Sequence, residues 1–159
     1  MLKLFGACLL FLGGLGLAFS FVRRETARLL DGEAYLDFLR YIRGEIHAFA
    51  RPREEIFRRY ENPRLTDNGF LPALRGSGSI EKALSQTAPP PEPPLAACLT
   101  AFDRTLGRGY LTEELAACDL AIERVASYTA QVRGEYPARV KVRRTAVLTG
   151  TLLLILLLL

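Results

Sequence analysis

Residues 115–136, LAACDLAIERVASYTAQVRGEY, decide the fold class of this chain. Apolar or small side chains recur there at alternating spacings of three and four residues: Leu115, Cys118, Ile122, Val125, Thr129, Val132 and Tyr136. This spacing places one stripe along an α-helix, and no other stretch of the chain keeps it as regularly. We predict a long amphipathic helix with Thr112 as its N-cap and with Glu113 and Glu114 near its positive end. Pro137 is expected to break or kink this helix.

A second helix is predicted nearer the N-terminus, where apolar residues are again spaced by four and three: Tyr35, Leu39, Ile42, Ile46 and Phe49. We expect it to be continuous from the apolar segment before it, despite Gly32 and Gly44. It should end at Arg51, because a proline disfavours helical geometry in the residue before it. Pro52 then opens another helix that runs through Glu61.

The segment that follows is predicted to hold shorter elements. NPRLTDNG at residues 62–69 is interpreted as a loop, and LPALRG at residues 71–76 as a single turn. Ser79 is expected to start a short helix. PPPEPP at residues 89–94 is interpreted as a stiff polyproline connector between helices, against the alternative of a ligand for a proline-recognition module.

One more helix is predicted to follow this connector and to stop at Gly107. Its apolar face consists of Leu95, Leu99, Phe102 and Leu106. No stretch alternates polar and apolar residues as a half-buried strand would. The expected fold is therefore all-α: an antiparallel bundle of about five to six helices over residues 23–144, flanked by N- and C-terminal membrane helices.

The chain carries an uncharged stretch near each end. LFGACLLFLGGLGLAFSFV, residues 4–22, is 19 residues long. As a helix it would measure about 28 Å, close to the thickness of the hydrocarbon core of a bilayer. We predict an uncleaved transmembrane anchor over residues 1–22, against the alternative of a secretory signal peptide cleaved near Ser20. Residues 145–159 make a second membrane segment of about 22 Å, which either inserts shallowly or completes a span with partners in the membrane.

Basic residues gather at the inner edges of both apolar segments: Arg23, Arg24, Arg28, Arg139, Lys141, Arg143 and Arg144. Only Lys3 and the terminal amine lie on the other side of the first segment, and no charged side chain follows the second. By the positive-inside rule, residues 23–144 are expected to form a cytoplasmic domain. The net charge of +4 and the pI near 9.2 then reflect membrane-edge charge and not nucleic-acid binding, for which no motif is present.

No set of residues in the sequence assembles a catalytic site. His47 is the single histidine, and a lone histidine beside Glu45 is more often a surface or core residue than a catalytic base. Cys8, Cys98 and Cys118 lack metal-ligand spacing and are predicted to be structural thiols in a reducing compartment. No glycine-rich phosphate loop is present. We predict a protein that is not an enzyme and that uses no cofactor, metal or small-molecule substrate.

Five segments, in order along nearly the whole chain, resemble the stage III sporulation protein AB family: MLKLFGA, GEIHAFARPREEIF, GSGSIEKAL, FDRTLGRGYLTEELAACDLAI and TGTLLLILLLL. The connector at residues 89–94 and Pro137 depart from the pattern of that family. The resemblance implies a component of the channel complex between mother cell and forespore in endospore-forming bacteria, located in the mother-cell membrane around the forespore. It also implies a helical soluble part like the cytoplasmic domains of type II secretion F-type platform proteins.

The same resemblance implies a platform role, in which the chain couples a cytoplasmic ATPase, the stage III sporulation AA protein, to the membrane assembly. Other proteins of the stage III sporulation A operon would be further partners, and self-association stays open. Partner contacts are expected where motif residues cluster near helix ends: Glu45, Asp103, Arg104, Gly107, Arg108 and Thr112. The alternative is a platform-like accessory of a type II secretion or pilus-type apparatus.

Overall fold

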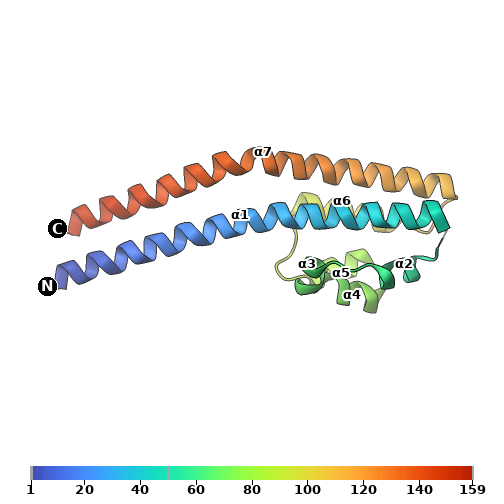
Figure 1. Ribbon diagram of the computed structural model, residues 1–159, viewed down its shortest axis with the longest axis horizontal. Coiled ribbons are helices and arrows are strands. Elements are labelled where there is room, and N and C mark those ends of the chain that lie inside the picture. Colours follow the sequence, from blue (N-terminus) through green and yellow to red (C-terminus); the bar gives the residue numbers. More distant parts are fainter. Residues whose placement is uncertain (1, 50, 159) are drawn as a thin grey trace. The chain divides into compact units, whose positions relative to one another are not determined.

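The computed structural model describes residues 2–49 and 51–158, and side chains throughout residues 22–142 except residue 50, with scattered positions on either side. The regular structure of these residues is entirely α-helical, which confirms the predicted all-α class (Figure 1). Seven helices occur in this part of the chain: α1 (Leu2–Phe49), α2 (Arg53–Arg59), α3 (Pro63–Asp67), α4 (Phe70–Ser77), α5 (Ile80–Gln86), α6 (Pro93–Thr105) and α7 (Leu111–Leu158).

The chain divides into two compact units, to which α1 and α7 both contribute. The central unit is Arg28–Gln131, and the terminal unit combines Met1–Ala27 with Val132–Leu159. The central unit contains all five short helices and lies within the predicted domain of residues 23–144.

The core of the central unit is built on one face of α1. Tyr35, Leu39, Ile42 and Ile46 are buried there, as their spacing predicts. Phe49, the last residue of the predicted stripe, is exposed instead. Phe38, which the stripe did not include, is the centre of an aromatic cluster on the side where α2, α3 and α4 lie along α1 (Figure 1). Its ring centroid lies 5.1 Å from that of Tyr60, 5.5 Å from that of Phe70 and 6.0 Å from that of Phe57.

Within the central unit, α1 and α7 run antiparallel in close contact. Arg43 pairs with Asp119 through an Nε–Oδ1 distance of 2.5 Å, and Gly32 lies against Thr129 about three helical turns away along α1. A Cβ atom on Gly32 would come within 2.9 Å of the Thr129 hydroxyl oxygen. The glycine that sequence reasoning treated as a tolerated interruption therefore permits the two long helices to approach each other.

Residues 60–78 contain more helix than their sequence predicted. The predicted loop at residues 62–69 includes α3, because the Asn62 side chain accepts a hydrogen bond from the Leu65 amide at 3.2 Å and Pro63 occupies the first turn. Leu65 is fully buried, and this burial stabilises the short helix. The predicted single turn is α4, eight residues long, bounded by Gly69 and Gly78 with φ values of +84° and +64°.

The predictions for α5 and α6 are confirmed. Ser79 is the N-cap of α5, and its hydroxyl accepts from the Lys82 amide. The predicted connector is shorter than residues 89–94, because its last two prolines form the first turn of α6, where a missing N–H costs no helical hydrogen bond. The predicted apolar face of α6 is buried, and Gly107 follows its C-cap with a φ of +78°.

Three predicted helix boundaries, in α1, α2 and α7, are wrong. α1 does not extend to Arg51, which is not helical; its last described residue is Phe49, and residue 50 lies outside the described residues. α2 is shorter than predicted and ends at Arg59, with Pro52 as its N-cap. Thr112 lies inside the first turn of α7 and does not cap it; the Glu113 carboxylate instead accepts a hydrogen bond from the Tyr110 amide at 3.1 Å.

Pro137 does not break α7: the helix continues through this residue to Leu158. An interior proline removes one backbone hydrogen bond but leaves those on either side of it available, so the helix can persist. In the terminal unit, the Thr26 and Tyr136 hydroxyl groups lie 3.0 Å apart, so that unit also joins α1 to α7.

The predicted membrane segments, residues 1–22 and 145–159, belong to the terminal unit. Their described backbone is helical, but most of their side chains lie outside the described residues. Across the residues that are described, no helix has a stretch sufficiently long and apolar for a membrane crossing.

Candidate partner-binding surface

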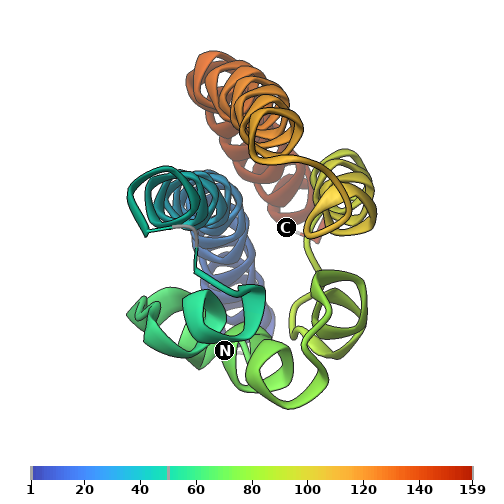
Figure 2. The same cartoon turned by 90° about the vertical axis from the view of Figure 1, so that its right-hand side faces the viewer.

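A cavity of about 500 Å³ opens at the end of the central unit where α1 ends and α7 begins. Figure 2 views the helices from this end. We call this feature the tip cavity. Its walls come from the end of α1, the start of α2, the turn between α6 and α7, and the start of α7. The lining residues are Ile46, Arg51, Pro52, Arg53, Glu54, Ile56, Leu106, Gly107, Arg108 and Glu114.

Local sequence explains why the helices stop around this cavity. Pro52 adopts an extended conformation that separates α1 from α2. Gly107 takes the left-handed conformation that ends α6, which a residue with a Cβ atom rarely adopts. Three buried apolar side chains line the base of the opening: Ile46, Ile56 and Leu106. The cavity thus combines an apolar base with a rim of charged side chains.

One wall of the tip cavity is held by Arg51. Its guanidinium forms an ion pair with Glu45 and lies over the Phe49 ring, 4.3 Å from the ring centroid. Its Nε atom is also 3.9 Å from a carboxylate oxygen of Glu55. Glu45, a predicted partner-contact residue, therefore supports the cavity wall through Arg51 and is itself half-buried.

A second wall is held by Arg53, which connects the cavity to a buried polar cluster. Arg53 forms an ion pair with Asp103 and donates a 2.7 Å hydrogen bond to the Gly78 carbonyl oxygen. The other oxygen of Asp103 accepts from the Ser79 hydroxyl at 2.8 Å and from the Glu81 amide at 3.1 Å. The Asp103 side chain is only 7% exposed. It joins α6 to the starts of α2 and α5, so its carboxylate is already used inside the unit.

Arg108 is the arginine of the rim that is free to meet a partner. Its side chain is exposed and makes no hydrogen bond or ion pair with any residue that the structure describes. Two residues further along the chain, the Tyr110 ring is 81% exposed, and Leu111 is also exposed. Arginine and tyrosine are side-chain types that dominate protein–protein binding.

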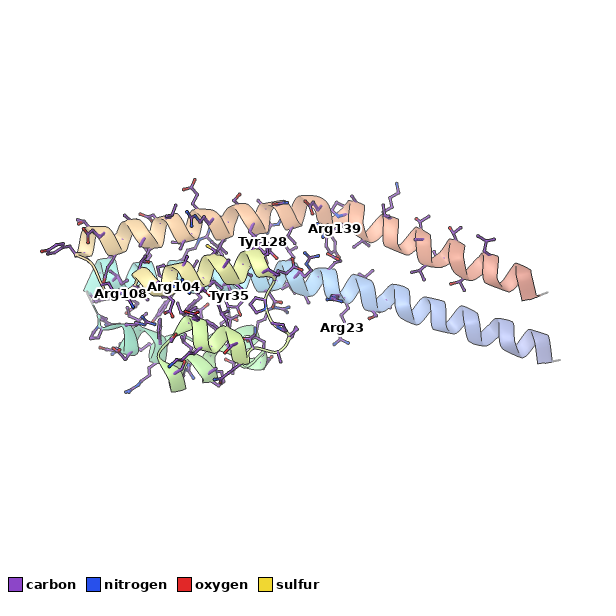
Figure 3. All side chains as sticks on the ribbon, turned by 180° about the vertical axis from the view of Figure 1, so that it is seen from behind. Arg23, Tyr35, Arg104, Arg108, Tyr128 and Arg139 are labelled. Atoms are coloured by element: carbon purple, nitrogen blue, oxygen red, sulfur yellow. The ribbon has the colours of Figure 1, made fainter. Side chains whose placement is uncertain are left out.

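The structure brings part of the predicted contact set together. Gly107 and Arg108 line the tip cavity, and Thr112 is exposed on the adjoining first turn of α7. Arg104 lies on α6 toward the same end of the central unit, with its guanidinium 3.4 Å from Glu81 (Figure 3). The sequence analysis did not identify Arg51, Arg53 or Glu114 as cavity residues. The available signal for the two arginines was Pro52 between them, which marks a helix end.

The predicted membrane-edge basic residues differ in their surroundings. Arg28 is half-buried in the central unit and forms an ion pair with Glu92, to which the Tyr128 hydroxyl also donates at 3.4 Å. In the terminal unit, Arg139 pairs with Glu135 (Figure 3). Exposed side chains are found at Arg23, Arg24 and Lys141, whereas the side chains of Arg143 and Arg144 lie outside the described residues.

The other chemically reactive side chains do not form a site in the described residues. His47 is exposed. Burial raises the pKa of the Cys118 thiol to about 11 and also raises that of Cys98, so both thiols are poor nucleophiles near neutral pH. Cys8 lies outside the described side chains. Within the described part of the chain, no group of three or more His, Cys, Asp or Glu side chains is placed to hold a metal ion.

The chain was compared with known protein families, with curated proteins and with solved structures. None of these three comparisons finds a match.

Proposed function

We propose that this chain is a non-enzymatic scaffold that holds a protein-binding helical unit at a bacterial cell membrane. The observation that carries the proposal is the tip cavity, which Arg108 lines with a side chain that has no partner among the described residues, and the exposed Tyr110 two residues further along the chain. Within the central unit, α1 runs from Arg28 to the cavity residue Ile46, and α7 runs from Leu111, close in the chain to the cavity residue Arg108, to Gln131, so the cavity lies at the end of the unit away from Arg28 and Gln131. A partner can therefore reach the cavity while the other end of the central unit is tethered.

The tether in this proposal is the pair of apolar segments, residues 4–22 and 145–159. The basic residues at their inner edges support a cytoplasmic position for the central unit, since cytoplasmic flanks of membrane segments are rich in arginine and lysine. Labelling of cysteines placed at Glu61 and Ala116, both exposed, tests this topology in whole cells. Modification by a reagent that does not enter cells would contradict it.

The resemblance to the stage III sporulation protein AB family supports a specific assembly, the channel complex between mother cell and forespore. In that assembly the tip cavity would bind the stage III sporulation AA ATPase and couple it to the membrane. The charges on the rim suit such contacts, because arginine-centred contacts with carboxylates are specific in geometry.

A capture experiment tests the proposal. The full-length chain in detergent is immobilised, and retention of the ATPase is compared for the wild type, Arg108→Glu and Tyr110→Ala. Both variants should retain at least about tenfold less ATPase, as expected for the loss of a central contact. Arg58→Glu is the matched control, since Arg58 is exposed on α2 and does not line the cavity.

Two results would overturn the proposal in different ways. Equal retention by all variants would exclude the tip cavity as the ATPase site. Expression of the gene in vegetative cells, with no rise in the mother cell during engulfment, would exclude the sporulation complex. That second result would favour an accessory of a secretion or pilus-type apparatus.

A further inference from the structure

A groove runs between α6 and α7 on a part of the central unit that the proposed function does not use. It contains two cavities, of about 410 Å³ and about 110 Å³, which share Cys98 and Arg124 in their linings. We call this feature the α6–α7 groove. Much of its lining consists of small side chains: Ala97, Cys98, Ala101, Ala117 and Ala121. None of its residues lines the tip cavity.

An exposed stripe of α7 lies beside this groove. Its residues are spaced by four and three and are all exposed: Ala116, Leu120, Glu123, Ser127 and Ala130. At about 100° per residue, the stripe is centred opposite the buried face formed by Cys118, Val125 and Thr129. Leu120 belongs to both features, since it lines the smaller cavity and is 48% exposed. A helix face with a four–three pattern and an exposed leucine is suited to packing against another helix.

Two unpaired charges of opposite sign lie at this surface, Glu123 on the stripe and Arg124 in the lining of the groove. Glu123 and Arg124 are adjacent and exposed, and neither makes a hydrogen bond or ion pair with another described residue. One turn earlier, Asp119 is fully used by Arg43 of α1. Glu123 is exposed to solvent, and Arg124 is exposed at the edge of the groove. Both charges are therefore available to a partner outside the chain.

We infer that the α6–α7 groove and this stripe form a contact with a second copy of the chain. Suppose that two α7 helices pack antiparallel about a twofold axis. Each residue of one copy then faces the residue of the other copy for which the two residue numbers add to the same total. If Glu123 of one copy faces Arg124 of the other, the same arrangement creates the reciprocal ion pair. Leu120 of each copy is then opposite Ser127 of the other, and Ala117 is opposite Ala130.

The side chains fit this pairing in size as well as charge. Ala117, Ser127 and Ala130 leave room between the longer side chains at this contact, so two helices can pack within the usual interaxial range of about 8–10 Å. Each Leu120 side chain can then enter the α6–α7 groove of the other copy. A partner must present a positive and a negative charge at matching positions, and a second copy of the chain does so by symmetry.

The test is a charge exchange, measured on the full-length chain in a mild detergent by sedimentation over a range of protein concentrations. The wild type should change from one copy to two as concentration rises. Glu123→Arg and Arg124→Glu should each weaken dimerisation by about tenfold or more, because each places like charges opposite each other. The double variant E123R/R124E should restore dimerisation, and Arg58→Glu should leave it unchanged.

Crosslinking keeps the inference testable if a charge variant fails to fold. In a background without native cysteines, Leu120→Cys and Ser127→Cys chains are mixed and treated with a short bismaleimide. More crosslinked dimer should form in the mixture than with either variant alone. A mixture in which Glu61→Cys replaces one of the two variants should give no such increase. A wild type that stays monomeric at every concentration, a double variant that fails to recover, or no preference in crosslinking would each overturn the inference. Tip-cavity variants should dimerise normally, so this result and the ATPase result can fail independently.

Discussion

Arg53 and Asp103 form an ion pair that joins the start of α2 to the end of α6, fifty residues away in the chain. The pair is asymmetric, because the Asp103 side chain is 7% exposed and that of Arg53 is 23% exposed. Asp103 also receives hydrogen bonds from Ser79 and from the Glu81 amide at the start of α5. Three helices therefore depend on one carboxylate.

Asp103→Asn should lower the free energy of unfolding by about 3 kcal/mol, since it removes the negative charge paired with the mostly buried Arg53 side chain and leaves its guanidinium with the neutral Gly78 carbonyl oxygen as an acceptor. The measurement is the midpoint of urea unfolding, followed by circular dichroism. Asp119→Asn is the matched control, because its partner Arg43 and Asp119 itself are exposed. An equal shift in the two variants would contradict a special role for the buried carboxylate.

Gly32→Ala should destabilise the central unit by about 1 kcal/mol, although alanine is normally the better helix former. The added Cβ would lie 2.9 Å from the Thr129 hydroxyl oxygen, so the helices must move apart or Thr129 must rotate. Thr129 is not free to rotate without cost, because its hydroxyl donates to the Val125 carbonyl oxygen at 2.8 Å.

Two further variants separate crowding from helix propensity. Gly44→Ala should raise stability by up to about 1 kcal/mol, since open space surrounds that position. In a Thr129→Ala background, Gly32→Ala should lose most of its destabilising effect, which a double-mutant cycle measures directly. Additive effects at Gly32 and Thr129 would show that they are not in contact.

The Arg43–Asp119 pair should make a contribution to stability that disappears in acid. The hydrogen bond from Arg43 lowers the pKa of Asp119 below its ordinary value of 3.8. A lowered folded-state pKa means that the contribution is complete above pH 3.8 and is lost as pH falls through the folded-state pKa. Carboxyl NMR shifts should show Asp119 titrating below its ordinary value in the wild type. Arg43→Gln should raise that midpoint, and an unchanged midpoint would exclude the pair in solution.

Cys118 should resist thiol reagents while the chain is folded. Burial, with the negative charges of Asp119 and Glu114 adding to it, raises its pKa to about 11, so at neutral pH the thiol is protonated as well as enclosed. In a chain with the other two cysteines replaced by serine, modification at pH 8 should be much slower without urea than with it. Equal rates in both conditions would contradict burial of this helix face.

The long helices could be predicted because their signal is local. The three–four spacing at residues 115–129 and 35–46 depends only on the helical period, and most of those apolar residues are buried where predicted. The errors lie in short elements and boundaries. α3 is helical because Leu65 has a core to enter, which its polar neighbours do not reveal.

The candidate partner surface was predictable only in part for the same reason. Gly107 and Arg108 could be placed at a helix end, since a glycine after an apolar stripe is a local stop signal. The roles of Arg51 and Arg53 were not accessible, because each depends on an acidic residue that the fold brings close: Glu45 for the first and Asp103 for the second.

The sequence by itself therefore determined the all-α class, the two long helices and the segregation of apolar and basic segments, because these follow from periodicity and composition along the chain. Only the tertiary structure decided which charged side chains form ion pairs within the chain and which do not. Asp103 is buried and paired with Arg53, whereas Arg108, Glu123 and Arg124 are exposed and have no partner among the described residues. That difference depends on contacts between residues distant in sequence, and those contacts form only when the helices pack.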